Sequence, residues 1–213
     1  MKITLVCGSP KAAGSGSAFL LKSLAGLLPD GTEHETVYLN RQAVTDEQAD
    51  AVLSADSVVI AFPLYVDGVP SQLLSCMDQI EKHCAGREKL PVVYVICNCG
   101  FFEPQHCHGA VDIMRFWTEH CGMKWGGGFS CGGGGGLDQM KGLAPLNAGP
   151  LCEYGKLLAA VADAAAKAVP LPDREVSVHL PEFAYRAGAH SNWRRQARKN
   201  GLKTRELRKK LTI

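Results

Sequence analysis

At the start of the chain, a continuous apolar run leads through a polar loop into a helical pattern. Residues 3–7 (ITLVC) are almost uniformly apolar, as in a strand buried on both faces of a sheet. Residues 8–17 are rich in Gly and Ser, and the apolar positions after them recur at helical spacing: Leu20, Leu21, Leu24, Leu27 and Leu28. The pattern predicts a strand, a loop and a helix, an order that points backbone N–H groups and a helix N-terminus at an anion.

The same alternation continues along most of the chain. Further strands are predicted at residues 35–40, 57–62, 91–97 and, more weakly, 123–129. Helical patterns occupy residues 45–56, 70–84, 110–121 and 150–169, the first of them opened by a capping box of Thr45 and Gln48. Strands that alternate with helices in this way predict an α/β fold: a doubly wound, five-stranded parallel sheet in the order 2-1-3-4-5, covered on both faces.

Three loops of unusual composition follow the first, third and fourth predicted strands. They are residues 8–17, residues 63–70 with a proline at each end, and residues 98–103. In a 2-1-3-4-5 sheet these strands lie side by side, and ligands bind beyond the carboxyl ends of parallel strands where the strand order reverses. We therefore expect one ligand to contact all three loops.

The three loops offer two kinds of chemistry. The first supplies glycine backbone, the hydroxyls of Ser9, Ser15 and Ser17 and the charge of Lys11, an inventory that suits a phosphate monoester. A loop that only caps a helix has the same composition. The other two loops carry apolar and aromatic side chains suited to a flat ring: Leu64, Tyr65, Val66, Phe101 and Phe102. A phosphate at one end and a planar heterocycle at the other describe a mononucleotide, and FMN fits.

These residues also carry a family resemblance. Gly8-Ser9-Pro10-Lys11 with residues 14–17 (GSGS), then Pro63-Leu64-Tyr65 with Pro70 and Asp78, resemble the NADPH-dependent FMN reductase family of flavodoxin-like proteins. The likeness extends over roughly the first 170 residues as an order of elements. A glycine run at residues 132–136 follows the fifth predicted strand, and the residues themselves assign it no role. This run and the segment from Trp193 to Leu202 are also similar to a subgroup of NAD(P)H-dependent oxidoreductases.

The resemblance implies a set of FMN contacts. The phosphate would be held by the first loop, through Ser9, Lys11, Ser15, Gly16 and Ser17. The ring would be held by the other two loops, through Pro63, Leu64, Tyr65, Val66, Asn98, Cys99, Gly100 and Phe101. A tyrosine after a buried strand is core packing about as often as a ring contact.

The resemblance also implies an activity. Electrons would pass from NADPH or NADH through bound FMN to a small acceptor, such as a quinone, a nitro compound or a free flavin. The chemistry then belongs to the flavin, so no catalytic side chain is assigned. Members of the family commonly form homodimers, and we expect one here. Pure electron transfer in the manner of flavodoxin is the alternative, although the first loop differs from the shorter, Thr-rich loop of flavodoxin itself.

Composition and charge bear on the cellular compartment and on how the chain is divided. The chain of 213 residues is 46% hydrophobic and 21% charged, and no apolar run reaches the length of a membrane span. Nine cysteines without paired CxxC spacing, and no signal peptide before the first strand, predict a reduced, cytoplasmic protein. The net charge of +2 hides an asymmetry, since the residues from Glu182 onward hold 10 Lys and Arg against 2 Asp and Glu. We therefore divide the chain into a flavodoxin-like domain, residues 1–171, and a basic helical extension, residues 172–213.

Other kinds of site are weighed against this interpretation. Cys97, Cys99, His106, Cys107 and His108 suggest a metal, but their spacing matches no ligand pattern and we predict none. A P-loop would need a lysine before the Ser or Thr at the helix start, and Gly16-Ser17 has none. The glycine spacing does not fit the dinucleotide fingerprint either.

The basic extension leaves two interpretations open. Tyr185, Ala189, Trp193 and Ala197 fall four residues apart and give a narrow apolar seam on a basic helix that Asn200 and Gly201 would cap. The favoured interpretation packs this helix on the acidic body or on a partner subunit. The other docks it on an anionic surface such as membrane lipid, and we expect no nucleic acid because base-reading features are absent. A docking module without catalysis is thus the second candidate function.

Overall fold

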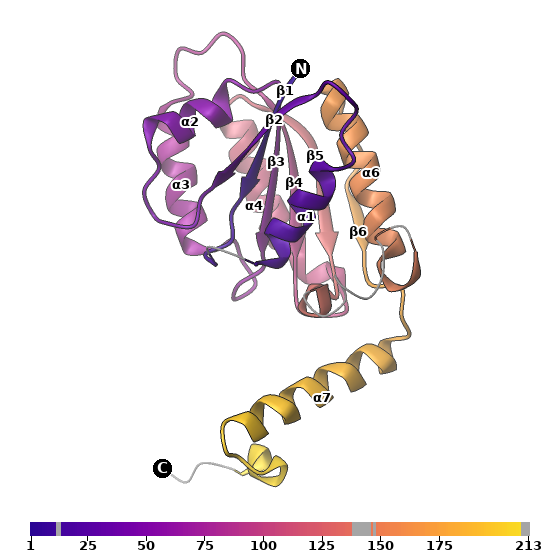
Figure 1. Cartoon of the computed structure of the whole chain (residues 1–213). Helices are drawn as coiled ribbons and strands as arrows, with labels where there is room; N and C mark the ends of the chain where they lie inside the picture. Colours follow the sequence, from indigo (N-terminus) through magenta and orange to yellow (C-terminus); the bar gives the residue numbers. More distant parts are fainter. Residues whose placement is uncertain (12–13, 138–145, 147, 210–213) are drawn as a thin grey trace. The chain divides into compact units, whose positions relative to one another are not determined.

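A computed structural model of the chain describes residues 1–11, 14–137, 146 and 148–209. Six parallel strands form one sheet in the order β2-β1-β3-β4-β5-β6 (Figure 1). The strands are β1 (Lys2–Cys7), β2 (Glu33–Tyr38), β3 (Ser57–Pro63), β4 (Val92–Asn98), β5 (Lys124–Cys131) and β6 (Arg174–Val176). The first five confirm the predicted doubly wound α/β fold and its 2-1-3-4-5 order.

Helices cover both faces of this sheet. They are α1 (Gly16–Ala25), α2 (Asp46–Leu53), α3 (Ser71–Lys82), α4 (His108–His120) and α6 (Cys152–Lys167). Side chains of α2, α3 and α4 share one hydrophobic core with one face of the strands, while α1 and α6 pack together on the other (Figure 1). Short 3₁₀ turns precede α4 and α6 and follow β5: η1 (Pro104–Cys107), η3 (Gly149–Leu151) and η2 (Gly134–Gly136).

The sequence prediction missed the sixth strand. β6 has three residues, and it pairs with β5 from Phe129 opposite Arg174 to Cys131 opposite Val176. A run this short, with two charged residues, shows no strand periodicity. Because β6 belongs to the sheet, the first compact unit extends to His179 and the second runs from Leu180 to Ile213. The predicted division into a domain of residues 1–171 and an extension of residues 172–213 stays a prediction.

The weak strand signal of β5 has a packing cause. A Cβ atom at Gly126 would lie 2.8 Å from the ring of Tyr94 on β4, and one at Gly127 would lie 2.8 Å from the carbonyl oxygen of Leu171. Tyr94 is fully buried, and its hydroxyl donates toward the carbonyl oxygens of Ala164 (3.0 Å) and Val169 (2.7 Å). Glycines make room for this tyrosine, and they also dilute the apolar pattern that identifies strands.

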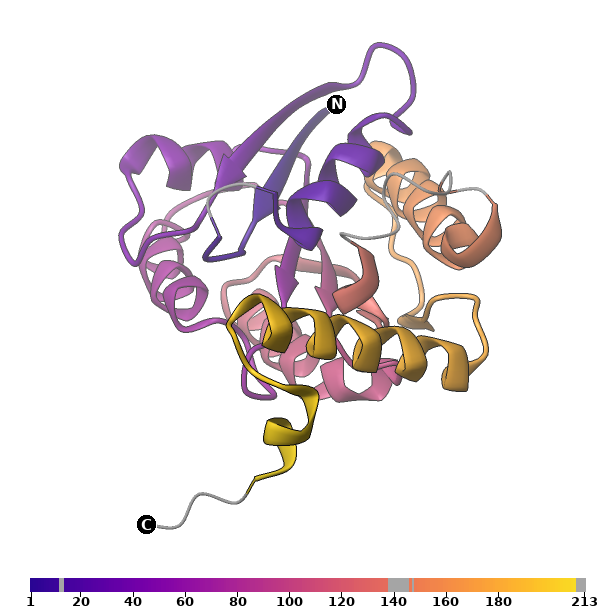
Figure 2. The same cartoon turned by 60° about the horizontal axis from the view of Figure 1, so that its bottom comes forward.

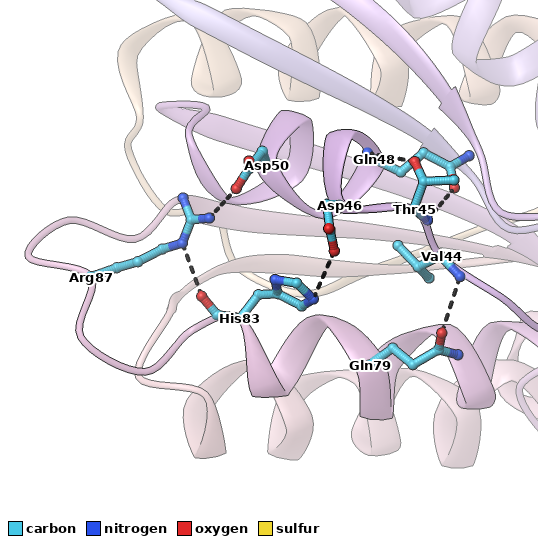
Figure 3. A network of polar contacts seen from close by, with 8 residues as sticks. All are labelled: Val44, Thr45, Asp46, Gln48, Asp50, Gln79, His83 and Arg87. Carbon is cyan, nitrogen blue, oxygen red and sulfur yellow. Dashed lines mark hydrogen bonds and ion pairs between the residues drawn. The ribbon is translucent and has the colours of Figure 1, made fainter.

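The predicted capping box is present at the start of α2. The hydroxyl of Thr45 accepts from the N–H of Gln48 (3.2 Å), and the N–H of Thr45 donates to the Gln48 side chain (3.1 Å; Figure 3). Arg87 ties the other end of α2 to the end of α3: it pairs with Asp50 and donates to the carbonyl oxygen of His83 (2.9 Å). These contacts fix how α2 and α3 lie on their face of the sheet.

The second unit is a helical hairpin. It contains α7 (Glu182–Lys199), a turn, and η4 (Thr204–Arg208), shown in yellow in Figure 2. Asn200 ends α7 as predicted, with its N–H directed at the carbonyl oxygen of Gln196, and Gly201 follows with a φ of 75°. The sequence also predicts a shorter basic helix after this turn, with Leu207 and Leu211 on one side; Leu207 lies in η4, and Leu211 lies outside the described residues. Within the described part of the chain, no helix combines the length and apolarity needed to span a bilayer.

Candidate functional site

Asn98, at the carboxyl end of β4, links the three loops that the sequence singles out. Its side-chain oxygen accepts a hydrogen bond from the hydroxyl of Ser17 (2.9 Å), which lies in the first turn of α1. Its carbonyl oxygen accepts from the N–H of Leu64 (2.9 Å), in the loop after β3. Asn98 is buried, so these bonds form away from solvent. The loops after β1, β3 and β4 therefore meet at one edge of the sheet, as predicted.

The first loop presents buried hydroxyls beside a helix N-terminus. Ser9, Ser15 and Ser17 are all buried, and Ser15 is the N-cap of α1, its hydroxyl accepting from the N–H of Ala18 (3.1 Å). The N–H groups of Gly16 and Ser17 point out of the helix start, and neither has an acceptor among the described residues. Two open donors at a helix N-terminus form an anion-binding position.

Lys11 forms its hydrogen bonds within the first loop. Its ammonium donates to the carbonyl oxygen of Gly14 (3.1 Å), and its N–H donates to the hydroxyl of Ser9 (3.3 Å). The side chain is exposed, so the ammonium adds positive charge at the mouth of the loop. This placement agrees with a role in attracting a phosphate.

Gln72, which the sequence did not single out, supports the same loop. It lies in the first turn of α3, is buried, and donates to the carbonyl oxygen of Gly8 (3.0 Å). A Cβ atom at Gly8 would lie 2.5 Å from the Leu73 side chain, so only glycine lets the loop approach α3 this closely. A polar residue beside Leu73 on the buried stripe of α3 is the signal that could have identified Gln72.

The loop after β3 is a tight hairpin with a strained tip. Tyr65 and Gly68 exchange two backbone hydrogen bonds of 3.1 Å, and between them Val66 and Asp67 have φ angles of 50° and 55°. Positive φ is costly for a β-branched residue such as valine, and strain of this kind is common at ligand-binding sites. The turn leaves Tyr65 half exposed and Val66 fully exposed, whereas Pro63 and Leu64 are half-buried.

The loop after β4 presents an aromatic pair. The Phe101 ring stacks on His106, with ring centroids 4.2 Å apart, and its side chain is 51% exposed. Cys99 is buried, and its thiol points at the carbonyl oxygens of Phe101 and Glu103, each 3.6 Å away. Gly100 between them is exposed. The Cys99 side chain therefore shapes the loop, and only its backbone can face a ligand.

The glycine run after β5, to which the sequence assigned no role, braces this loop. The N–H groups of Gly133 and Gly134 donate to the carbonyl oxygens of Phe101 (2.5 Å) and Cys99 (2.7 Å). A Cβ atom at Gly132 would lie only 2.2 Å from the carbonyl oxygen of Phe102. A Cβ atom at Gly134 would lie 2.8 Å from the carbonyl oxygen of Cys99, so the backbones meet too closely for a side chain at both positions. Residues 138–145, which follow, lie outside the described residues.

Four buried cysteines lie behind the β4 loop: Cys97, Cys99, Cys107 and Cys131. A hydrogen bond with Cys97, with burial as a further cause, raises the pKa of Cys107 to about 12. The neighbouring Cys107 and burial raise the pKa of Cys99 far above its ordinary value, and burial does the same to Cys131. Raised pKa values keep Cys99, Cys107 and Cys131 as thiols at neutral pH, and a protonated, buried thiol is a poor nucleophile and a poor metal ligand.

The two histidines of the metal hypothesis are engaged elsewhere, because His106 stacks on Phe101 and His108 pairs with Glu175 on β6. Among the described residues, the group of potential ligands close enough to share one ion is Cys152, Glu153 and His179. Glu153 there already pairs with Lys156 (2.7 Å). The absence of a metal site at the β4 loop remains a prediction.

No family model and no curated protein sequence matches this chain. Solved structures match it in fold. One is an apo NADH:FMN oxidoreductase, with 16% identity and a TM-score of 0.57; the match covers 79% of this chain and 89% of that one. Another is an FMN-dependent NADH-azoreductase from Bacillus anthracis in complex with FMN, with 17% identity and a TM-score of 0.50; the match covers 78% of this chain and 99% of that one. A third is the rubredoxin oxygen:oxidoreductase of Desulfovibrio gigas, with 14% identity and a TM-score of 0.54. That match covers 78% of this chain but only 35% of the other protein's length. The likeness shows that the body has the flavodoxin-like fold, shared with FMN reductases and azoreductases.

Proposed function

We propose that this chain binds FMN where its three loops meet and passes electrons from NADH or NADPH through the flavin to a small acceptor. The observation that carries the proposal is the pair of hydrogen bonds at Asn98, to Ser17 and to Leu64. They join a phosphate-suited loop to two loops with exposed aromatic side chains. Fold neighbours whose names include FMN support the same assignment.

The phosphate of FMN fits the first loop. The N–H groups of Gly16 and Ser17 are open at the helix start. The hydroxyl of Ser15 caps the helix and lies 3.8 Å from the Cys7 thiol, and it would turn its proton toward the phosphate. The hydroxyl of Ser17 donates to Asn98, so Ser17 would bind through its N–H. Ser9 and Lys11 complete the loop. Charge-assisted hydrogen bonds of this type are each worth about 1.5–3 kcal/mol.

The ring of FMN fits the other two loops. Tyr65 and Phe101 are each about half exposed, on loops that leave neighbouring strands at one edge of the sheet. They offer flat apolar surface, with Pro63, Leu64 and Val66 beside it. The backbone from Asn98 to Gly100 lies at the same edge and would supply polar contacts to the ring. The braces at Gly133 and Gly134 hold this backbone in place, so that little reorganisation is needed on binding.

The chemistry of the proposed reaction would come from the flavin, which accepts and releases electrons in pairs or singly. The chain would bind and orient the cofactor and limit the access of water. We assign no side chain as acid, base or nucleophile. The raised pKa values of Cys99 and Cys107 argue against a thiolate at this edge. The acceptor is proposed only as a class: a quinone, a nitro or azo compound, or a free flavin.

The experiment is an anaerobic absorption spectrum of the FMN-loaded protein before and after addition of NADPH or NADH. The proposal predicts visible flavin bands that bleach with at least one nicotinamide and return with a quinone. FMN-loaded protein that neither nicotinamide bleaches, but that dithionite bleaches, would support an electron carrier instead. Ser15→Ala in the first loop should weaken FMN binding. The control Ser23→Ala, at a half-buried serine later in α1, should leave FMN binding unchanged.

A further inference from the structure

The second unit, Leu180 to Ile213, has an unusual charge. It holds 10 Lys and Arg against 2 Asp and Glu, so it carries +8, while the rest of the chain carries −6. Both acidic residues are already engaged: Glu182 pairs with Arg186, and Glu206 pairs with Lys209 (3.5 Å) and accepts from the N–H of Lys203 (2.6 Å). The remaining positive charge is therefore not neutralised within the unit.

Arg194, Arg198 and Arg205 illustrate this excess. None of the three has an acidic partner among the described residues. All three are exposed. Exposed guanidinium groups without a carboxylate are positioned to bind external anions, and they bind phosphate best because the planar fork makes paired hydrogen bonds.

The same unit also exposes large apolar side chains. Phe183 and Trp193 on α7 are 76% and 64% exposed, and Leu202 and Leu207 beyond it are about half exposed. Ala197 is the buried residue of the described part of this unit. The hairpin leaves Phe183 and Trp193 largely exposed, and exposed aromatic and leucine side chains beside arginines suit the interface where lipid headgroups meet hydrocarbon.

A groove between α7 and η4 brings the two kinds of group together. Its volume is about 430 Å³, and it is lined by His190, Trp193, Arg194, Thr204, Arg205 and Leu207. Two guanidinium groups and a hydroxyl suit a phosphate, while an indole and a leucine suit the apolar chain next to it. Tryptophan is enriched where lipid headgroups meet hydrocarbon. The groove thus matches the headgroup of a phospholipid rather than a free anion.

We propose that the second unit is a docking surface for an anionic phospholipid bilayer, with α7 lying in the interface and the groove holding a lipid phosphate. Charge complementarity selects the anionic surface. Aromatic side chains such as Trp193 also stack on nucleic-acid bases, so it is the exposed aliphatic side chains of Leu202 and Leu207 that favour a bilayer, which offers hydrocarbon beside the phosphate. The proposal does not depend on the bound flavin. It describes attachment to a membrane surface, not insertion across it.

The test is co-sedimentation of the full chain with vesicles of phosphatidylglycerol and phosphatidylcholine, against vesicles of phosphatidylcholine alone. We expect binding to the anionic vesicles only, weakened by salt. The double variant Arg194→Gln/Arg205→Gln should bind about 30-fold more weakly, because each basic residue near an anionic surface contributes about 1 kcal/mol. The control Lys22→Gln/Lys82→Gln removes the same net charge from α1 and α3 and should bind like the wild type.

A spectroscopic readout tests the apolar contact separately. Trp193 emission should shift to the blue on anionic vesicles, and Trp193→Phe should keep the binding while losing the shift. The proposal is overturned by equal binding to both vesicle types, by equal loss in both double variants, or by displacement with glycerol 3-phosphate, which would indicate a site for a free phosphate. Tighter binding to an RNA oligonucleotide than to anionic vesicles at equal salt would also overturn it.

Discussion

The body and the second unit of this chain are held together by different means. In the described residues from Met1 to His179, most apolar side chains of the strands and helices are buried against the sheet, and buried hydrogen bonds such as Ser17 to Asn98 fix the loops. From Leu180 onward, the aromatic side chains of Phe183 and Trp193 are exposed and the charge is strongly positive. Buried apolar side chains stabilise the fold of the body, whereas the exposed ones of the second unit are available to bind another surface.

The two units should differ most in how much stability they lose when a glycine is replaced by alanine. Gly132→Ala in the body places a Cβ atom 2.2 Å from the Phe102 carbonyl oxygen, and the neighbouring backbone cannot yield without breaking the loop braces. We expect urea unfolding to show a loss of about 3 kcal/mol. Gly188→Ala in α7 meets nothing within 4 Å and should cost nothing, since alanine favours a helix by up to about 1 kcal/mol. Equal destabilisation by both variants would contradict the contrast.

A second comparison uses asparagine. Asn98→Ala leaves the Ser17 hydroxyl buried without its acceptor, so we expect a loss of about 2 kcal/mol in unfolding free energy. The loops should also loosen, and the dissociation constant for FMN measured by fluorescence should rise about tenfold or more. Asn192→Ala, which removes an exposed contact with Arg195 in α7, should change unfolding by less than about 0.5 kcal/mol. An unchanged FMN affinity in Asn98→Ala would remove Asn98 from the site.

Helix capping gives a third, smaller difference. Thr45→Ala removes half of the capping box of α2 (Figure 3) and should lower the unfolding free energy by about 1 kcal/mol. The N-cap residue of α7 is Pro181, which provides no side-chain cap, and Ser191→Ala on the exposed surface of α7 should have no measurable cost. Thermal unfolding of the two variants side by side measures the difference. Thr45→Ala with an unchanged midpoint would show that the packing of α2 alone sets its stability.

The smallest effect concerns charge. A hydrogen bond from Lys89, then one from the N–H of Lys2 (2.8 Å), lowers the pKa of Asp56. A depressed folded-state pKa stabilises the fold above the unfolded value of about 4, and this contribution disappears as pH falls through the folded value. Asp56→Asn should therefore be less stable than the wild type near neutral pH, by less than about 1 kcal/mol because the pair is partly exposed, and the gap should close in acid. A gap in urea midpoint that stays constant down to acid pH would contradict this.

The sequence predicted the features that depend on periodicity. The five long strands, their order, the capping box of Thr45 and Gln48, and the convergence of the three loops all follow from runs of apolar residues and from the rules of parallel sheets. β6 was not predicted because a strand of three residues is too short to show a periodic pattern.

The fine structure of the site could not be predicted in the same way. The hydrogen bond of Ser17 to Asn98 joins residues 81 positions apart in the sequence, and neither residue type indicates which residue it will pair with. The braces at Gly133 and Gly134 depend on the approach of two backbones, which a run of glycines permits but does not specify. The individual FMN contacts, from Ser9 to Phe101, remain predictions for the same reason.

The most direct test of the account is an equilibrium titration of the purified, flavin-free chain with FMN and, separately, with riboflavin, which lacks the phosphate. If the first loop holds the phosphate and the other two hold the ring, both ligands should bind at one site, with FMN at least about 100-fold tighter. Ser15→Ala should narrow that ratio, and Ser23→Ala should not. Saturable binding of neither flavin, or equal affinity for the two, would contradict the central claim.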